Sequence, residues 1–142
     1  TEELSERFGL PIVSLCGSRM TVSNTRYSIM DAGPEEFLGL FKNASFICTD
    51  SFHGTVFSII FRKDFLCFKQ GQATETSVNS RLYSILDKLG LLSRIIAYTG
   101  DKMNFKEKLD DGSNSIDYGL VERRLANERE LSVKFLEEAL KD

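Results

Sequence analysis

The 142-residue chain has no tryptophan, two prolines and a single histidine, His53. One histidine and three cysteines without a Cys-x-x-Cys pair do not make a metal-ligand set, so we expect no metal. No stretch of eighteen apolar residues is present, which predicts that nothing spans a membrane. No charged segment followed by an apolar one opens the chain, so no leader for secretion is expected. A net charge of −3 leaves no basic excess, and we expect no nucleic-acid partner.

The three cysteines, Cys16, Cys48 and Cys67, each lie in an apolar run that we predict to be a strand. A reduced cysteine behaves as a small apolar residue, so buried free thiols are the simplest interpretation. Free thiols are typical of a reducing compartment. We therefore expect a cytoplasmic protein.

The chain contains enough apolar residues for the core of one domain, which we predict to span residues 1–142. Apolar residues make up 42% of the sequence and include eleven phenylalanines. Residues 1–8 have the pattern of a helix end, with Gly9 at the position that closes a helix and Pro11 just beyond. There is no initiator methionine, and we expect the chain to be a fragment of a longer protein.

The chain is organised around residues 45–61, in which two apolar runs flank a polar interruption at residues 49–54. We interpret this stretch as a buried strand, a sharp turn and a buried helix over residues 55–61. Where a strand gives way to a helix, several backbone N–H groups lack partners, and the helix dipole adds partial positive charge. Such a corner binds anions, phosphate above all.

A hairpin is the alternative structure for this stretch. The second run is rich in β-branched and aromatic residues, and both kinds favour strands. Two features favour the helix: Asp50 or Ser51 supplies a good N-cap, and a fresh strand-like run at 65–68 follows the polar residues 62–64. A run that is apolar on nearly every side then indicates a helix buried against a sheet.

The rest of the chain predicts alternating strands and helices. Further strands are expected at residues 10–16, near Tyr27 and within 92–98, and further helices from Gly33-Pro34 to Asn43, over 79–89 and from Asp117 onward. The polar segments 69–78 and 99–115 are predicted as a candidate lid and a surface excursion. The last helix carries an apolar stripe along its length, made of Val121, Leu125, Ser132, Leu136 and Leu140.

Alternating strands and helices at this spacing predict an α/β fold, a Rossmann-like parallel sheet flanked by helices. In such sheets ligands bind beyond the carboxyl ends of the strands. The polar residues 49–54 leave the carboxyl end of a strand that should be central. The pattern of residues and the rule for the fold therefore indicate the same place.

The candidate site residues at this corner are Asp50, Ser51, His53, Gly54 and Thr55. Ser51 and Thr55 supply hydroxyls, and Gly54 lets an anion approach the backbone. The imidazole of His53 is of a type that titrates near neutrality. When protonated it can hold a phosphate or deliver a proton as a general acid.

Simpler interpretations of these residues stay open. A lone histidine near a turn is often structural, and Asp50 and Ser51 serve equally well as plain helix caps. The glycine patterns of phosphate loops and dinucleotide-binding folds are absent. A phosphoacceptor receiver domain also has an aspartate at a strand end, but it needs an acidic pair after the first strand, where this chain has Gly17-Ser18-Arg19.

Residues 31–38, 42–44 and 49–61 resemble the carboxyl-terminal part of the polysaccharide pyruvyl transferase family. The most specific part of the resemblance is Thr49-Asp50-Ser51-Phe52-His53-Gly54; residues 79–91 and 116–118 are similar to the family as well. Asp64 stands where a proline is expected, a departure that touches the turn and not the pocket.

The resemblance implies two Rossmann-like domains in a GT-B-like arrangement, of which this chain would be the carboxyl-terminal, donor-binding half. Family members transfer pyruvate from phosphoenolpyruvate to two hydroxyls of a sugar as a ketal, without a metal or another cofactor. The implied partners are phosphoenolpyruvate, a saccharide acceptor of a bacterial surface polysaccharide, and the missing amino-terminal domain of the same chain. The isolated fragment is expected to be inactive.

By analogy with the family, His53 is the catalytic residue that binds or protonates the donor. The substrate-binding residues that the resemblance implies are Asp50, Ser51, Gly54, Thr55, Asn79 and Arg81. The guanidinium of Arg81 matches a carboxylate or a phosphate in bidentate fashion. The alternative for Arg81 is a solvent-facing helix residue.

A second class of function stays open. A GT-B-like domain that has kept the fold can instead bind a nucleotide-sugar, as half of a glycosyltransferase, or act as a binding module without catalysis. Titration with phosphoenolpyruvate, phosphate and nucleotide-sugars would separate the two classes.

Overall fold

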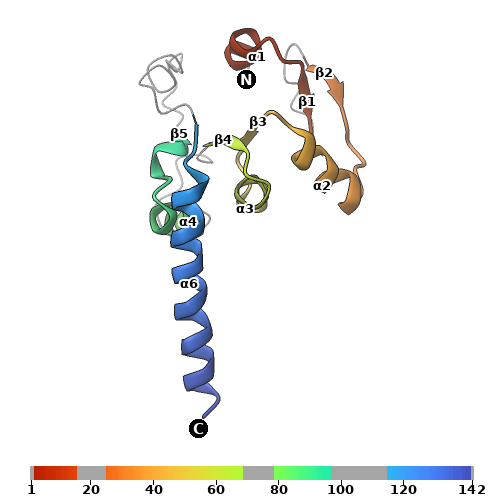
Figure 1. The fold of residues 1–142 in the computed structure, drawn as a ribbon. Helices are drawn as coiled ribbons and strands as arrows, with labels where there is room; N and C mark the ends of the chain where they lie inside the picture. Colours follow the sequence, from red (N-terminus) through yellow and green to blue (C-terminus); the bar gives the residue numbers. More distant parts are fainter. Residues whose placement is uncertain (1, 16–24, 69–78, 97–114, 142) are drawn as a thin grey trace.

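The computed structural model describes residues 2–15, 25–68, 79–96 and 115–141 (Figure 1). Helices and strands alternate along most of this length. In chain order they are α1 Glu2–Phe8, β1 Ile12–Ser14, β2 Thr25–Ser28, α2 Pro34–Asn43, β3 Phe46–Thr49, α3 Phe52–Ile60, β4 Asp64–Phe68, α4 Asn79–Leu89, the short 3₁₀ helix η1 Leu92–Arg94, β5 Ile95–Ile96 and α6 Tyr118–Ala139.

The strands form two parallel sheets, which confirms a mixed α/β fold with parallel sheets flanked by helices. One sheet pairs β1 with β2, and the other has the order β3-β4-β5. Among the described strands β3 therefore lies at an edge and β4 at the centre, because β1 and β2 pair in a sheet of their own; the expectation that the strand before residues 49–54 is central is wrong. In the second sheet each strand is followed by a helix and then by the neighbouring strand, as in βαβ units. The carboxyl ends of β3 and β4 therefore lie at the same edge of the sheet.

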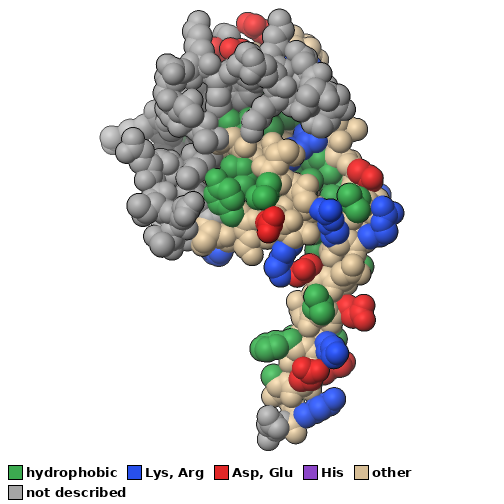
Figure 2. Space-filling view, turned by 90° about the vertical axis from the view of Figure 1, so that its left-hand side faces the viewer, with side chains coloured by type: hydrophobic (Ala, Val, Ile, Leu, Met, Phe, Trp, Pro, Cys, Tyr) green, Lys and Arg blue, Asp and Glu red, His purple; other side chains and the backbone are tan. Residues whose placement is uncertain are grey.

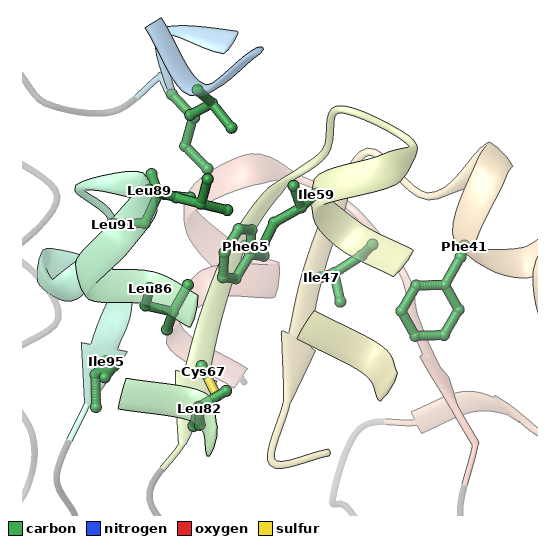
Figure 3. Close-up of a cluster of buried hydrophobic side chains, with 12 residues drawn as sticks. Phe41, Ile47, Ile59, Phe65, Cys67, Leu82, Leu86, Leu89, Leu91 and Ile95 are labelled. Carbon is green, nitrogen blue, oxygen red and sulfur yellow. The ribbon is translucent and has the colours of Figure 1, made fainter. Parts of the chain in front are cut away.

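The two faces of the β3-β4-β5 sheet are covered by different helices. On one face, side chains of the strands pack with residues of α2, α3, α4 and α6 in the main buried cluster, centred on Phe65 (Figure 3). On the other face Leu4 of α1 packs with Leu66 and Ile96. Phe65, Leu66 and Cys67 of β4 are all buried, as expected of a central parallel strand covered on both sides.

The predicted elements are largely present. α2 begins at Pro34, where the proline at the first position predicted it, and α4 spans residues 79–89 as the leucine spacing indicated. Gly9 and Gly90 close α1 and α4 with φ of +61° and +71°, a conformation that glycine adopts without strain. The expected strand within 92–98 is two residues long, preceded by η1. The predicted lid at 69–78, and residues 99–114 of the predicted surface excursion, lie outside the described residues.

The stretch at 45–61 forms a strand and a helix, so the alternative hairpin is wrong. The boundary of the helix differs from the prediction. α3 begins at Phe52 rather than at residue 55, so His53 and Gly54 belong to its first turn. The cap residue decides this: Ser51 is the N-cap, and the helix starts directly after it.

The apolar stripe predicted along α6 is covered only over the first half of the helix. Val121 is buried and Leu125 packs against the main cluster. Farther along, large apolar side chains are exposed, among them Leu131, Phe135, Leu136 and Leu140. This end of α6 extends away from the rest of the described chain (Figure 2). No helix among the described residues is long and apolar enough to cross a membrane.

The turn between α3 and β4 anchors the start of α6. The hydroxyl of Tyr118 donates to the carbonyl oxygen of Lys63, and the carbonyl oxygen of Ser58 lies 3.3 Å from it. Asp64 accepts a hydrogen bond of 3.0 Å from the backbone N–H of Ile116. Burial, and then the nearby Asp64 carboxylate, raise the pKa of Tyr118 above its usual range. The aspartate at position 64 therefore has a structural role at this turn.

Replacing Tyr118 with Phe removes the hydroxyl and leaves a partly buried carbonyl oxygen without its donor. We expect Y118F to lower the free energy of unfolding by about 1–2 kcal/mol, measured by urea denaturation at pH 7.5. The matched control is Y27F, because Tyr27 is 56% exposed. An equal effect of the two substitutions would contradict the anchoring role of Tyr118.

Cys48 of β3 packs against the second buried cluster, the one formed by Leu4, Leu66 and Ile96. Burial raises the pKa of the Cys48 thiol from 9.0 to about 11. Burial also raises the pKa of Cys67. A raised pKa means that the unfolded chain loses the thiol proton at lower pH than the folded chain does. The contribution of the protonated Cys48 thiol to the free energy of unfolding is therefore fully present below about pH 9 and is lost as the pH rises toward 11.

We expect the stability difference between the parent chain and C48A to depend on pH. Up to pH 8 the difference is constant; between pH 9 and about pH 10.5 it shrinks by about 1.5 kcal/mol, because only the parent carries this thiol. Urea denaturation under reducing conditions at a series of pH values measures it. The control is I60A, at a 59% exposed and non-titrating position, whose difference from the parent stays constant. A pH-independent difference for C48A would exclude the buried-thiol linkage.

Candidate functional site

The site is built where β3 ends and α3 begins. The hydroxyl of Thr49, the last residue of β3, accepts a hydrogen bond of 3.1 Å from the backbone N–H of Ser51. The Ser51 hydroxyl in turn accepts from the backbone N–H of Gly54 at 3.4 Å, which makes Ser51 the N-cap. These two bonds turn the chain from strand to helix within two residues. The first turn of α3, where the helix dipole places partial positive charge, thus follows directly on the carboxyl end of β3.

Gly54 is required because Thr49 occupies the space beside it. A Cβ atom at Gly54 would lie 2.2 Å from the Thr49 hydroxyl oxygen and 3.0 Å from its Cβ. Gly54 is buried, and its N–H is used in the cap. The structure therefore supplies a packing reason for this glycine. We predicted that Gly54 contacts an anion. That contact stays a prediction, and the burial of Gly54 and the use of its N–H in the cap do not favour it.

Thr55 lies under the corner rather than on its surface. It is fully buried, and its hydroxyl donates to the Ser51 carbonyl oxygen at 3.1 Å. The same hydroxyl lies 3.4 Å from the sulfur of Cys67 in β4. Thr55 thereby ties the first turn of α3 to its own cap and to the neighbouring strand, which favours packing over the predicted ligand contact.

His53 and Arg81 both contact one aromatic ring, that of Phe52. His53 is exposed in the first turn of α3, and its imidazole contacts Phe52 edge-to-face, with 5.9 Å between the ring centroids. Arg81, in the first turn of α4, places its guanidinium carbon 5.3 Å from the centroid of the same Phe52 ring. The corner thus brings together two basic side chains from two helices that both begin at the carboxyl edge of the sheet.

Other predicted site residues take different places. Asp50 and Ser51 are exposed in the turn directly before α3. Asn79 is the first residue of α4, two positions before Arg81. His53, Ser51, Asp50 and Arg81 are therefore brought to one edge of the sheet. Their roles toward a ligand stay predictions.

Phe52 is a residue of the corner that was not among the predicted site residues. An aromatic residue directly before the only histidine gives no sign that it will also contact an arginine much later in the chain. The parallel order β3-β4, which sets α3 and α4 side by side, produces that contact. The described residues contain no group of three His, Cys, Asp or Glu side chains that could hold a metal ion.

The fold and the corner define a class: an α/β unit with a helix N-terminus and two basic side chains beyond the carboxyl ends of parallel strands. Such a unit is suited to binding an anion. Residues 6–71 match the model of one family, described as polysaccharide pyruvyl transferase. The resemblance is thus confirmed for this part of the chain, which runs from α1 past β4 and contains the whole β3–α3 corner. No curated protein matches the chain, and no solved structure matches it.

Replacing Gly54 with Ala should disrupt the corner, because the new methyl group would overlap the Thr49 side chain. We expect G54A to cost about 2–3 kcal/mol in the free energy of unfolding. The matched control is G39A: Gly39 lies in α2 with no atom within 4 Å of a built Cβ, so this change should stabilise by about 0.5–1 kcal/mol.

The double variant T49A/G54A tests the cause, since it removes the hydroxyl and methyl groups that the new side chain meets. It should be less unstable than the sum of T49A and G54A measured separately, by urea denaturation. Additive effects would show that Thr49 does not make the glycine necessary.

Proposed function

We propose that this chain forms the donor-binding part of a polysaccharide pyruvyl transferase, with the β3–α3 corner as the site for phosphoenolpyruvate. One observation carries the proposal: the segment that matches the family contains an exposed His53 in the first turn of a helix, and His53 and Arg81 contact the same Phe52 ring. Phosphoenolpyruvate has two anionic ends. A helix N-terminus and a guanidinium provide two places of opposite charge to receive them.

In this proposal the start of α3 and His53 hold the phosphate end, and Arg81 holds the carboxylate. His53, when protonated, gives its proton to the methylene carbon of phosphoenolpyruvate, which becomes a methyl group. One sugar hydroxyl then bonds to the central carbon and loses its proton. That proton goes to the imidazole of His53. The bond from the central carbon to the phosphate oxygen breaks and phosphate leaves; the second hydroxyl then bonds to the same carbon, gives its proton to the released phosphate and closes the ketal. Donors around the leaving phosphate stabilise its charge.

Asp50 has a different place in the proposal. Its carboxylate is exposed beside the corner and would repel a phosphate. A carboxylate accepts hydrogen bonds from hydroxyl groups, so we assign Asp50 to the saccharide acceptor rather than to the donor. The rest of the acceptor site would come from a second Rossmann-like domain in a GT-B-like arrangement, and the 142-residue chain alone would bind the donor without turning it over.

The test is binding of phosphoenolpyruvate to the 142-residue chain, followed by calorimetry and thermal shift. We expect R81Q to weaken binding about tenfold, because a charge-assisted hydrogen bond is lost. H53A should also weaken it. The matched control is K88Q, which removes one positive charge from the other end of α4, where Lys88 pairs with Glu128. K88Q should bind phosphoenolpyruvate as the parent does.

Three results would contradict the proposal. Equal loss of affinity in R81Q and K88Q would mean that only the net charge matters. Tighter binding of a nucleotide-sugar than of phosphoenolpyruvate would favour a glycosyltransferase half. Binding of none of these ligands, with the fold intact by circular dichroism, would leave a module without donor binding.

A further inference from the structure

We propose that Phe52 is a positioning residue that holds the guanidinium of Arg81 over the start of α3, so that Arg81 and His53 act on one anion. This inference rests on the proposed function and goes beyond it, because it assigns the arrangement of the two basic groups to a side chain without any charge.

Phe52 contacts both basic groups. Its ring is 5.3 Å from the Arg81 guanidinium carbon, within the distance at which a cation is attracted to an aromatic face. The same ring meets the His53 imidazole at 79° between the ring planes, with 5.9 Å between centroids. Both basic side chains are exposed, whereas Phe52 is half-buried at the first position of α3.

An arginine without such a contact would sample many rotamers in water. The side chain loses rotamer freedom whenever a ligand fixes it, and that loss weakens binding. A ring that already restrains the guanidinium removes part of this cost. Phe52 is not among the residues of either buried cluster, so its size is not explained by the core of the described residues.

Phe52 suits this task better than a polar residue would. A carboxylate beside Arg81 would also restrain it, but it would neutralise the charge that the ligand needs. An aromatic ring attracts the cation through its quadrupole and leaves the guanidinium N–H donors available in its plane. The arrangement keeps the charge of the guanidinium available to an anion.

The experiment is a double-mutant cycle on the 142-residue chain, with the dissociation constant for phosphoenolpyruvate measured by calorimetry. F52L keeps an apolar side chain but removes the ring, and we expect it to weaken binding about two- to fivefold. In the R81Q background F52L should cause no further loss, because the group it positions is gone. In the H53A background F52L should weaken binding by the same factor as in the parent chain. F52Y, which keeps the ring, should bind as the parent does.

A second readout does not depend on the ligand. In the nuclear magnetic resonance spectrum, the Nε–H proton of Arg81 should shift toward its random-coil position in F52L and stay in place in F52Y, since the ring current of Phe52 acts on it. No change in F52L would overturn the inference whatever the chain binds.

The outcomes separate this inference from the proposed function. Additive losses for F52L and R81Q would overturn the positioning role and leave the donor site standing. A parent chain that binds no phosphoenolpyruvate would overturn the donor site. The Arg81 shift would then decide whether Phe52 still holds the guanidinium.

Discussion

The contact between Thr49 and the first turn of α3 is the constraint on which the site depends. The Thr49 hydroxyl accepts the Ser51 N–H, and the same side chain fills the space that any Cβ at Gly54 would need. Two residues, Asp50 and Ser51, separate the end of β3 from the start of α3. The first turn of α3, with Phe52 and His53, therefore follows closely on the carboxyl end of the strand.

The sequence predicted the elements that local patterns determine. Leucine spacing and Gly90 gave the bounds of α4, and Pro34 gave the start of α2. The start of α3 was predicted three residues too late, because two cap candidates stood side by side and β-branched residues blurred the helix pattern. The Thr49 hydroxyl accepts a hydrogen bond from the Ser51 N–H, which favours Ser51 as the cap. The spacing of apolar residues does not predict such a contact.

Contacts between distant parts of the chain were the least predictable. The sequence named His53 and Arg81 as candidates, but their contact with one shared ring follows from strand order and helix placement. The stripe on α6 gives a similar lesson. Periodicity predicts which face of a helix is apolar, but it does not say where along that face the packing ends, and the partly buried residues of α6 stop at residue 128.

Local geometry has to supply any attraction for an anion here, because the chain as a whole carries a charge of −3. Salt at physiological strength screens exposed charges beyond about 8 Å, so distant acidic residues weaken such a site little. The groups that determine the attraction for an anion are therefore the nearest ones: the start of α3, His53, Arg81 and, with opposite sign, Asp50. Both basic groups stand at helix starts that follow neighbouring parallel strands. The strand order β3-β4 is therefore the feature that brings the imidazole of His53 and the guanidinium of Arg81 to one ring.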